Sequence, residues 1–252
     1  MRRIDSPKND QVKAWKKLHT RKGREKEQQF LIEGFHLIEE AMKSSITIET
    51  LLLTDETSVP QSWQLNKLDC VEISQSVMKE ISETKTPQGI AAVCQIPAKP
   101  SVQVNGGQFL LIDRVQDPGN VGTMIRTADA AGLTAVILGQ GCADLYNSKV
   151  IRASQGSLFH LPVIIAELST WIAHCKETGI PVFGTALKGA SSYSAIEPQS
   201  DFALLVGNEG EGVTPSLLAT CDQNMYIPIY GQAESLNVAV ATGILLYYLR
   251  AN

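Results

Sequence analysis

The sequence predicts an α/β protein of two domains, of which the second has a mostly parallel sheet flanked by helices. From Gln108 onwards, apolar runs of strand length alternate with helical stretches, a pattern typical of parallel sheets with helices on both faces. The first part of the chain shows the order β-α-β-β-α-β, which fits a small α/β domain. Between them, the segment PAKPSVQVNGG interrupts the pattern with two prolines and a Gly-Gly pair. We therefore expect domains at 1–97 and 109–252 and a linker at 98–108.

The N-terminal domain is expected to start with a basic helix at Lys8–Lys22. Val12, Trp15 and Leu18 fall on one side of that helix at helical spacing. The later elements, in chain order, are a strand-to-helix unit at Phe30–Ser44, a buried strand at Ile48–Glu56, a strand running into a capped helix at Cys70–Ser82 and a strand within Thr86–Ile96.

The C-terminal domain is expected to alternate strands and helices, and ligands of such sheets bind at the carboxyl ends of the strands. Strands are predicted at Phe109–Val115, Thr134–Leu138, Leu161–Ile165, Pro181–Ala186, Ala203–Gly207 and Met225–Ile229. Helices are predicted near Val121–Ala131, Asn147–Leu158, Ser169–Glu177, Pro215–Ala219 and Leu236–Leu249.

The composition is ordinary for a soluble globular protein, with 44% hydrophobic and 19% charged residues. No apolar run reaches the roughly 20 residues that span a bilayer, and the N-terminal segment lacks the apolar core of a signal peptide. The five cysteines are scattered without a C-x-x-C pair, and the four histidines lack metal-ligand spacing. These observations favour a cytoplasmic protein with no metal and no membrane partner.

Positive charge is concentrated at the N-terminus. Between Met1 and Lys26, ten lysines and arginines face three acidic residues, so this segment carries +7. The whole chain carries −4, which leaves −11 for the remainder. A basic segment on an acidic body is typical of proteins that bind phosphate backbones, and a solvated helix face is an equally good explanation. Trp15 and His19 either stack on bases or pack locally.

Three polar loops in the second half of the chain are the candidate functional site. They lie in DRVQDPGNVGTMIRTADAAG (Asp113–Gly132), LLVGNEGEGV (Leu204–Val213) and IPIYGQAESLNVAVATGI (Ile227–Ile244). Each follows a strand-like run and precedes an apolar stretch. If they share one sheet edge, they form a ligand pocket of backbone amides and small side chains.

Several common chemistries are not supported by these loops. There is no G-x-x-x-x-G-K-[ST] phosphate loop, and GNVGTM lacks the glycine spacing of a dinucleotide fingerprint. No G-x-S-x-G nucleophile elbow occurs. The pocket therefore offers mainly backbone donors, one arginine and one glutamate.

Three ordered motifs carry a resemblance to a known family. They are N-V-G-x-x-x-R-T-A at Asn120–Ala128, G-N-E-G-x-G at Gly207–Gly212 and I-P-I…S-L-N-V-A-V-A-T-G-I from Ile227. Together they resemble the signature motifs of SpoU (TrmH-type) RNA 2'-O-ribose methyltransferases of the SPOUT superfamily. FLIEGFHLIEEA and TPQGIAAV are similar to that family's N-terminal substrate-binding domain.

This resemblance implies S-adenosylmethionine as the cofactor, held by the loops of a trefoil knot, and structured RNA as the substrate. Amide donors and apolar walls would surround the adenine, and a glycine would let the backbone approach it closely. Carried over by motif, the cofactor-binding residues are Thr185, Ala186, Gly207, Ile227, Pro228 and Leu236.

The resemblance also implies four residues of the chemistry. Arg126 matches the arginine of the first motif, and we favour phosphate anchoring and alkoxide stabilisation over proton abstraction for it. Asn120 either orients Arg126 or the ribose, or caps the helix that begins near Val121. Glu209 either bonds the target or cofactor, or caps its own turn. For Asn237, a contact to target or cofactor is favoured over a role in the turn that precedes the last helix.

Three further polar residues and one apolar run complete the expectations. Ser235 is expected to cap the last helix. Arg152 and Gln155 resemble a family segment near the mouth of the active site, which makes them candidate RNA contacts. The run Val238–Leu249 is expected to form core or a dimer surface.

The expected function is S-adenosylmethionine-dependent methyl transfer to a ribose 2'-hydroxyl of structured RNA. Ribosomal RNA is favoured over transfer RNA because of the separate N-terminal domain, and the resemblance implies a homodimer. The alternative is a non-catalytic RNA-binding or ribosome-assembly factor with the same fold. Intact Arg126, Asn120, Gly207 and Asn237 argue against that alternative.

Overall fold

The computed structural model describes residues 2–63, 65–98, 102 and 104–250. Contacts group the chain into two compact units. Unit 1 contains Met1–Ala98 and Asp144–Phe159, and unit 2 contains Lys99–Ala143 and His160–Asn252. Residues 144–159, which the sequence analysis assigned to the C-terminal domain, thus pack within unit 1. The linker predicted at 98–108 lies partly outside the described residues, and its boundaries stay a prediction.

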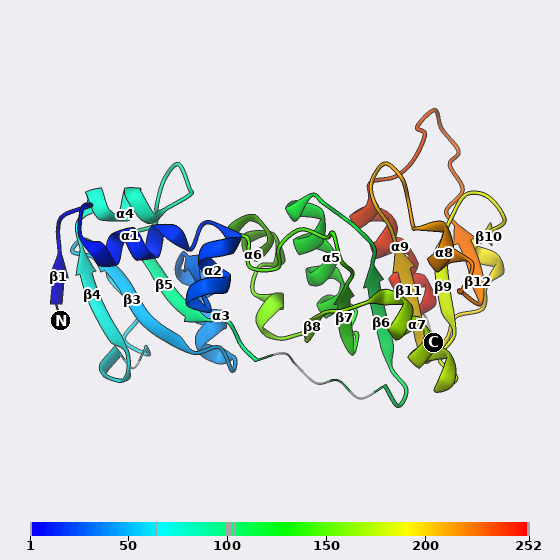
Figure 1. The fold of residues 1–252 in the computed structure, drawn as a ribbon, viewed down its shortest axis with the longest axis horizontal. Helices are drawn as coiled ribbons and strands as arrows, with labels where there is room; N and C mark the ends of the chain where they lie inside the picture. Colours follow the sequence, from blue (N-terminus) through cyan, green and yellow to red (C-terminus); the bar gives the residue numbers. More distant parts are fainter. Residues whose placement is uncertain (1, 64, 99–101, 103, 251–252) are drawn as a thin grey trace. The chain divides into compact units, whose positions relative to one another are not determined.

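Unit 1 is built on a five-stranded sheet in the order β1-β4-β3-β5-β2 (Figure 1). β1, β4 and β3 run parallel, whereas β5 is antiparallel to both β3 and β2. The order β2-α3-β3-β4-α4-β5 confirms the predicted β-α-β-β-α-β pattern. The strands are β1 (Arg2–Ile4), β2 (Gln29–Glu33), β3 (Ile48–Thr54), β4 (Asp69–Ile73) and β5 (Ile90–Gln95). The helices are α1 (Asp10–Lys17), α2 (Arg21–Glu27), α3 (Phe35–Lys43), η1 (Leu65–Lys67), α4 (Gln75–Ile81), α6 (Ser148–Ser154) and η2 (Ser157–Phe159).

Both faces of this sheet are buried, and the alternation along β3 shows how. Leu52 belongs to the core shared with α1 and α4, whereas Leu51 and Leu53 belong to the core shared with α3 and α6. Val12 and Trp15 of α1 lie in the first of these cores, at 0% and 7% exposure. The predicted apolar side of the basic helix is therefore confirmed.

The single helix predicted at Lys8–Lys22 is wrong, because the chain forms two helices, α1 and α2. Thr20 caps α2: its hydroxyl accepts a hydrogen bond from the N–H of Gly23 at 3.1 Å. Gly23 makes this tight junction feasible, since a Cβ there would lie 2.0 Å from the carbonyl oxygen of Lys17.

Unit 2 contains a seven-stranded sheet in the order β10-β12-β9-β11-β6-β7-β8, and all of its pairs are parallel. The predicted mostly parallel sheet is confirmed. Every residue of β7 and β11 is buried, as is every residue of β6 after Gln108, as expected of strands covered on both faces. The strands are β6 (Gln108–Ile112), β7 (Ala135–Leu138), β8 (Val163–Ile165), β9 (Val182–Thr185), β10 (Ser191–Ser192), β11 (Phe202–Val206) and β12 (Gln223–Tyr226). The helices are α5 (Pro118–Ala130), α7 (Leu168–Glu177), η3 (Tyr193–Ala195), α8 (Pro215–Leu218) and α9 (Val238–Leu249).

One predicted helix differs in its extent. The helix predicted at Asn147–Leu158 ends at Ser154, because Gln155 adopts a left-handed φ of 51° and ends α6. A short 3-10 turn, η2, follows it. Within the described part of the chain, no helix is both long and apolar enough to cross a membrane.

Candidate active site

The three candidate loops leave the sheet of unit 2 at one edge. β12, β9, β11 and β6 are consecutive parallel strands, so their carboxyl ends point to the same side. The loop after β6 leads into α5, the loop after β11 leads towards α8, and the loop after β12 leads into α9 (Figure 1). The structure therefore assembles the loops as the sequence predicts.

Side-chain hydrogen bonds join one residue from each motif. Asn237 Nδ2 donates to Asn120 Oδ1 at 3.0 Å, and Asn120 Nδ2 donates to Glu209 Oε1 at 3.0 Å. We call these three residues the amide–carboxylate chain. It ends at the Glu209 carboxylate, which also accepts from the backbone N–H groups of Gln116 and Asp117 at 3.4 and 3.3 Å.

Glu209 is the acidic end of the amide–carboxylate chain. Partial burial alone would raise the pKa of this carboxyl group. The hydrogen bonds from Asn120 and from the backbone N–H groups of Glu209 itself, Asp117 and Gln116 outweigh burial, and together they lower the pKa below the ordinary 4.5. The site therefore contains a carboxylate that is ionised at neutral pH.

The helix caps differ from the expectations. α5 begins at Pro118, and Asp117 caps it by accepting a hydrogen bond from the N–H of Asn120 at 2.9 Å. Asn120 thus lies inside the first turn, and its interpretation as the cap is wrong; the Asp-Pro pair was the missed signal. α9 is capped by Asn237, whose Oδ1 accepts from two backbone N–H groups at 2.9 and 3.3 Å. The expectation that Ser235 caps α9 is therefore also wrong.

Two residues that the sequence reasoning missed hold the loops together. Asp113, only 4% exposed, accepts from both the N–H and the hydroxyl of Thr214 at 2.7 Å. Asn208 Nδ2 donates to the carbonyl of Arg114 at 2.8 Å, and Asn208 Oδ1 accepts two N–H bonds of its own turn at 2.9 and 3.1 Å. One of the two roles predicted for Glu209 was to cap the turn in which it lies. Asn208 accepts the backbone N–H groups of that turn instead.

Arg126 lies on α5 together with Asn120, six positions further along. Its side chain is exposed and forms no hydrogen bond or ion pair within the described ranges. The structure thus shows no contact through which Asn120 would orient Arg126. α5 packs against α9, so Arg126 lies on a helix that is fixed at the site.

The candidate cofactor residues gather at the ends of three neighbouring strands, with one exception. The exception is Leu236, which lies on the exposed loop before α9 and is itself 37% exposed. Thr185 and Ala186 lie at the end of β9, and Gly207 follows β11. Ile227 and Pro228 follow β12.

Some polar groups of these residues already form hydrogen bonds within the sheet. The Ala186 N–H donates to a carbonyl of β12 at 3.1 Å, and the Thr185 hydroxyl donates to a carbonyl of β11 at 3.1 Å. A Cβ on Gly207 would lie 2.2 Å from the backbone nitrogen of Val213. The structure thus shows a close approach of Gly207 to the protein's own loop, and the expected approach to the cofactor stays a prediction.

The remaining groups fit an adenosine-type cofactor. Ile227 and Pro228 are half-buried, and the backbone N–H groups of Ile227 and Ile229 donate no hydrogen bond within the described residues. Apolar walls with free amide donors suit an adenine ring.

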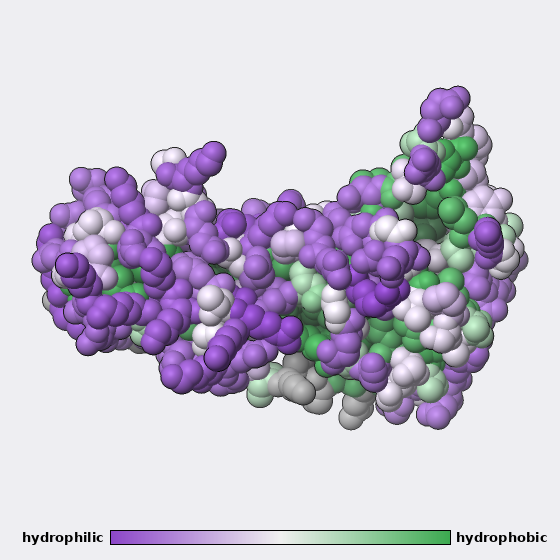
Figure 2. Space-filling model, turned by 45° about the horizontal axis from the view of Figure 1, so that its top comes forward, coloured by the Kyte–Doolittle hydropathy of each residue, from purple (hydrophilic) through white to green (hydrophobic). Residues whose placement is uncertain are grey.

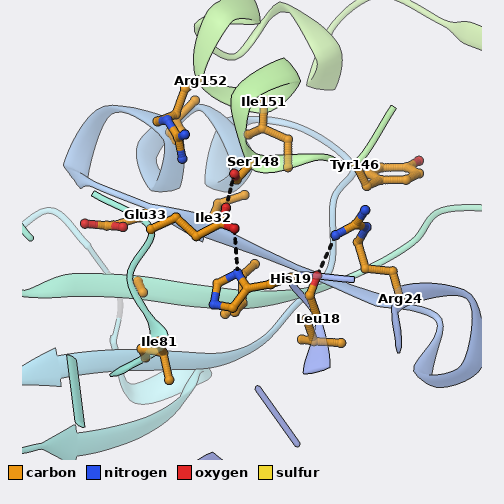
Figure 3. Close-up of a pocket in the computed structure, with 14 residues that line it drawn as sticks. Leu18, His19, Arg24, Ile32, Glu33, Ile81, Tyr146, Ser148, Ile151 and Arg152 are labelled. Atoms are coloured by element: carbon orange, nitrogen blue, oxygen red, sulfur yellow. Dashed lines mark hydrogen bonds and ion pairs between the residues drawn. The ribbon is translucent and has the colours of Figure 1, made fainter. Parts of the chain in front are cut away.

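Unit 1 contains a separate small cavity of about 30 Å³ (Figure 3). The buried Arg24 donates to Asp144 at 2.6 Å there. Glu83 accepts from the Ser148 hydroxyl and lies 3.6 Å from His19 Nδ1. Arg24 Nε and His19 Nε2 are buried and have no hydrogen-bond partner among the described residues, and a cavity of this size accommodates a water molecule for them. This cavity is part of the packing of residues 144–159.

Arg152 and Gln155, the candidate RNA contacts, belong to the same packing. Arg152 lines the cavity, and the carbonyl of Gln155 lies 3.1 Å from His36 Nε2. Trp15 is buried and His19 lines the cavity, so both aromatic residues pack locally.

The basic N-terminal segment is folded and largely ion-paired. Its pairs are Arg2 with Asp69, Arg3 with Asp5 and Glu72, Lys13 with Asp10, Lys16 with Glu80, Arg21 with Glu25, and Arg24 with Asp144. Asp5, Asp10 and Glu25 are already counted in the +7, and four partners outside the segment, Asp69, Glu72, Glu80 and Asp144, offset four of these seven charges within unit 1, which favours the solvated helix face over a free RNA-binding arm.

Comparison with known proteins defines the class of this site. Residues 107–247 match the SpoU rRNA Methylase family, and residues 9–92 match the MRM3-like substrate binding domain. A solved structure of an AdoMet-bound rRNA methyltransferase from Sinorhizobium meliloti superimposes with a TM-score of 0.90 at 31% identity, covering 99% of this chain and 97% of that one. The family match and the fold are those of S-adenosylmethionine-dependent RNA methyltransferases.

Sequence relatives agree with this class. The 23S rRNA (guanosine(2553)-2'-O)-methyltransferase RlmP of Bacillus subtilis (strain 168) is 51% identical over 250 residues, 99% of this chain and 100% of that protein. The 23S rRNA (uridine(2479)-2'-O)-methyltransferase of Streptomyces viridochromogenes is 32% identical over 262 residues, 98% of this chain and 91% of that protein. The chain belongs to the SpoU rRNA methylase family. The predicted family, fold class, 2'-O-methyltransferase activity and cofactor are confirmed; the trefoil knot and the roles of individual site residues stay predictions.

Proposed function

We propose that this enzyme methylates the ribose 2'-hydroxyl of a guanosine in 23S rRNA, at the position equivalent to the one named for the Bacillus relative. The observation that carries the proposal is 51% identity over essentially the full length of both chains. Identity to the relative named for a uridine is lower, at 32%. A cytoplasmic location belongs to the same proposal.

We propose that the ends of β9, β11 and β12 hold the cofactor. Ile227 and Pro228 form apolar walls, the free N–H groups near them bind the adenine edge, and Leu236 covers it from the loop before α9. Thr185, Ala186 and Gly207 shape the pocket through the backbone they fix. When bound, S-adenosylmethionine supplies a methyl group on a positively charged sulfonium.

The amide–carboxylate chain is proposed to orient the ribose. A hydroxyl group is a weak nucleophile near neutral pH, so its position relative to the methyl donor decides the rate. Asn120 and Asn237 supply amide groups whose orientation is fixed by their mutual hydrogen bond, and Glu209 fixes the far end. This arrangement suits a role in positioning the 2'-hydroxyl.

Arg126 is proposed to bind a phosphate of the substrate and to stabilise the alkoxide that develops. Arginine stays protonated under all relevant conditions, so it acts as a cation and not as a proton acceptor. Its exposed guanidinium, without a protein partner among the described residues, is free to make two hydrogen bonds to phosphate.

We also infer a homodimer with α9 at the contact. Val240, Ile244 and Tyr247 are 54%, 38% and 56% exposed, and their spacing of four and three places them on one face of α9. Figure 2 shows apolar patches on unit 2, whereas the visible face of unit 1 is mostly hydrophilic. Ile244→Glu should shift the mass in sedimentation from dimer to monomer, and a monomeric wild type at micromolar concentration would contradict the inference.

Ribose-methylation mapping of ribosomal RNA tests the proposed substrate. RNA from cells that lack this protein should lose one 2'-O-methyl group, at the 23S position equivalent to that of the Bacillus relative. The purified enzyme with S-adenosylmethionine should restore it. An unchanged methylation pattern, or a lost methyl group in transfer RNA instead, would refute the proposed target.

Arg126→Ala tests the proposed role of the arginine. Methyl transfer should fall by roughly 100-fold or more, the usual scale for removing a group that stabilises a developing oxyanion. Calorimetry should show cofactor binding close to wild type, since Arg126 is not among the cofactor residues. Arg126→Lys should recover only part of the activity, because it keeps the charge and loses the bidentate geometry.

A further inference from the structure

Tyr230 stands out among the described aromatic residues because almost nothing covers it. It is 96% exposed, its ring forms no ring–ring contact, and its hydroxyl forms no hydrogen bond within the described residues. Three of the other tyrosines form ring contacts, Tyr146 with Phe30 and Tyr193 with Tyr248, and Tyr247 on α9 is only 56% exposed. A large aromatic side chain held in water is typical of a binding surface.

The position of Tyr230 connects it to the active site. It lies on the loop between β12 and α9, between the apolar wall at Ile227 and Pro228 and the amide of Asn237. All residues from 230 to 237 are exposed. Figure 1 shows this loop, coloured orange to red, projecting from the rest of unit 2. On the neighbouring loop after β9, Leu187 is 75% exposed.

The composition of the loop indicates how it would contact RNA. The stretch YGQAESL at 230–236 contains no lysine or arginine and one glutamate. It therefore has no charge with which to attract phosphate groups. The ring of Tyr230 is its one large apolar surface besides Leu236, and an aromatic ring binds the flat face of a base without needing charge.

We propose that Tyr230 stacks on an unpaired base of the RNA substrate and thereby positions the substrate strand at the methyl-transfer site. This inference rests on the proposed function of the same site. A stacked base fixes the strand within one nucleotide of the contact, and such registration is what selects one ribose among many identical hydroxyl groups. Tyr230 is accordingly a specificity-determining residue for an unpaired nucleotide.

Substitution of Tyr230 should act on RNA and not on the cofactor. Tyr230→Ala should raise the KM for a 23S rRNA fragment about 5- to 150-fold, which corresponds to the roughly 1–3 kcal/mol lost when a base–aromatic stack is removed. The Kd for S-adenosylmethionine and the mass in sedimentation should stay as in the wild type. Tyr230→Phe and Tyr230→Trp should retain binding, because the ring and not the hydroxyl makes the contact. Gln232→Ala, a change at an exposed residue of the same loop, serves as the matched control.

Abasic substitution in the RNA identifies the base. Fragments that lack one base at the methylated nucleotide or at a flanking nucleotide are tested with both enzymes. Removal of the base that stacks on Tyr230 should weaken RNA binding by the wild type. It should have little effect on RNA binding by Tyr230→Ala, since that variant has already lost the stacking contact. Additive losses at every position would overturn the stacking.

Other results would overturn the inference in distinguishable ways. An RNA KM within twofold of wild type for Tyr230→Ala refutes it directly. A change confined to cofactor binding assigns the ring to the cofactor pocket, and a change in mass assigns it to a subunit contact. If the wild type methylates no rRNA fragment, the proposed function fails, and the RNA Kd of the same variants still decides whether Tyr230 binds a base.

Discussion

Replacing Asn120 by aspartate tests the amide–carboxylate chain at a single link. Asn120→Asp keeps the shape of the side chain and removes the N–H that donates to Glu209. It places a second carboxylate oxygen where that nitrogen lies, 3.0 Å from Glu209 Oε1. Asn237 can still donate to the new side chain as it does to Asn120. The substitution therefore perturbs one contact and leaves the cap of α9 intact.

The expected magnitude follows from two contributions. A hydrogen bond to a charged group contributes about 1.5–3 kcal/mol. Repulsion between two unit charges at the 3.0 Å of the present contact is roughly 1.4 kcal/mol in bulk water and roughly 5.5 kcal/mol at an effective dielectric of 20. Glu209 is exposed, so the lower figure applies. We expect a loss of about 3 kcal/mol in the free energy of unfolding and a fall in methyl transfer on the order of 100-fold.

Urea unfolding and single-turnover methyl transfer between pH 4 and 8 provide the assay. In the wild type the pKa of Glu209 is lowered, so its ionised form stabilises the native state above the ordinary value of 4.5, and this contribution is lost as pH falls through the lower native pKa. In Asn120→Asp the two carboxylates share a site, which raises the apparent pKa of the pair. The deficit of the variant should therefore shrink as the pH falls towards 5.

The double substitution Asn120→Asp with Glu209→Gln is the matched control. It exchanges donor and acceptor, so the new amide at 209 can donate to the new carboxylate at 120, and only one charge remains. Stability should recover towards the wild type beyond either single change. Equal stability and turnover of Asn120→Asp and wild type, or a double variant no better than Asn120→Asp, would refute the coupling of these residues.

Three further substitutions, with Gly210→Ala as a control for the first, test the scaffold and the basic segment. Gly207→Ala should abolish the native packing of unit 2, because its Cβ would lie 2.2 Å from a backbone nitrogen. In Gly210→Ala the nearest atom would lie 3.7 Å from the new Cβ, so this control should change the melting temperature little. Thermal unfolding of both variants tests this. Asp144→Ala should lower the free energy of unfolding by about 3–5 kcal/mol, since it leaves Arg24, which is only 4% exposed, without its counter-ion. Urea unfolding measures this loss, and a loss below about 1 kcal/mol would contradict the prediction. Lys17→Glu reverses an exposed charge of the basic segment and should leave the slope of log K for RNA against log salt unchanged, as expected of a solvated helix face; a slope shallower by about 1 would instead show that Lys17 contacts phosphate.

The order of helices and strands could be predicted because it depends on local patterns. Apolar periodicity located every strand of unit 2 except the two-residue β10, and the parallel topology follows from the alternation of strands with helices. β1, at Arg2–Ile4, was missed because three residues with one apolar side chain carry no period.

The tertiary assignment of residues 144–159 could not be predicted for a different reason. A helix was expected there, and α6 forms. Ile151 and Phe159 are apolar, and an apolar side chain does not indicate which of two cores it will join. In the structure both join the core beneath α3 in unit 1. The buried pair of Arg24 and Asp144, 120 positions apart, holds the segment there.

The contacts of the amide–carboxylate chain also could not be predicted from the sequence. Its two links join residues 117 and 89 positions apart. Pattern and resemblance named Asn120, Glu209 and Asn237 separately, with capping as the competing role for two of them. Only the structure shows that Asn237 is both a cap and a link, and that Asn120 is a link and not a cap.

The amide–carboxylate chain determines which hydrogen-bonding groups are left for a substrate. Because Asn120 Nδ2 faces a carboxylate and its Oδ1 faces an amide N–H, its side chain cannot flip without losing both contacts. A primary amide has two N–H donors and two acceptor lone pairs. Asn120 therefore retains one N–H and one lone pair, and Asn237 retains one N–H. In the proposed role, the ribose hydroxyl would donate a hydrogen bond to the free lone pair of the Asn120 oxygen, and its own oxygen would accept from a free amide N–H, so the amides would orient the hydroxyl without taking its proton. The lowered pKa of Glu209 sustains this order, since protonation would remove the charge that fixes the Asn120 amide.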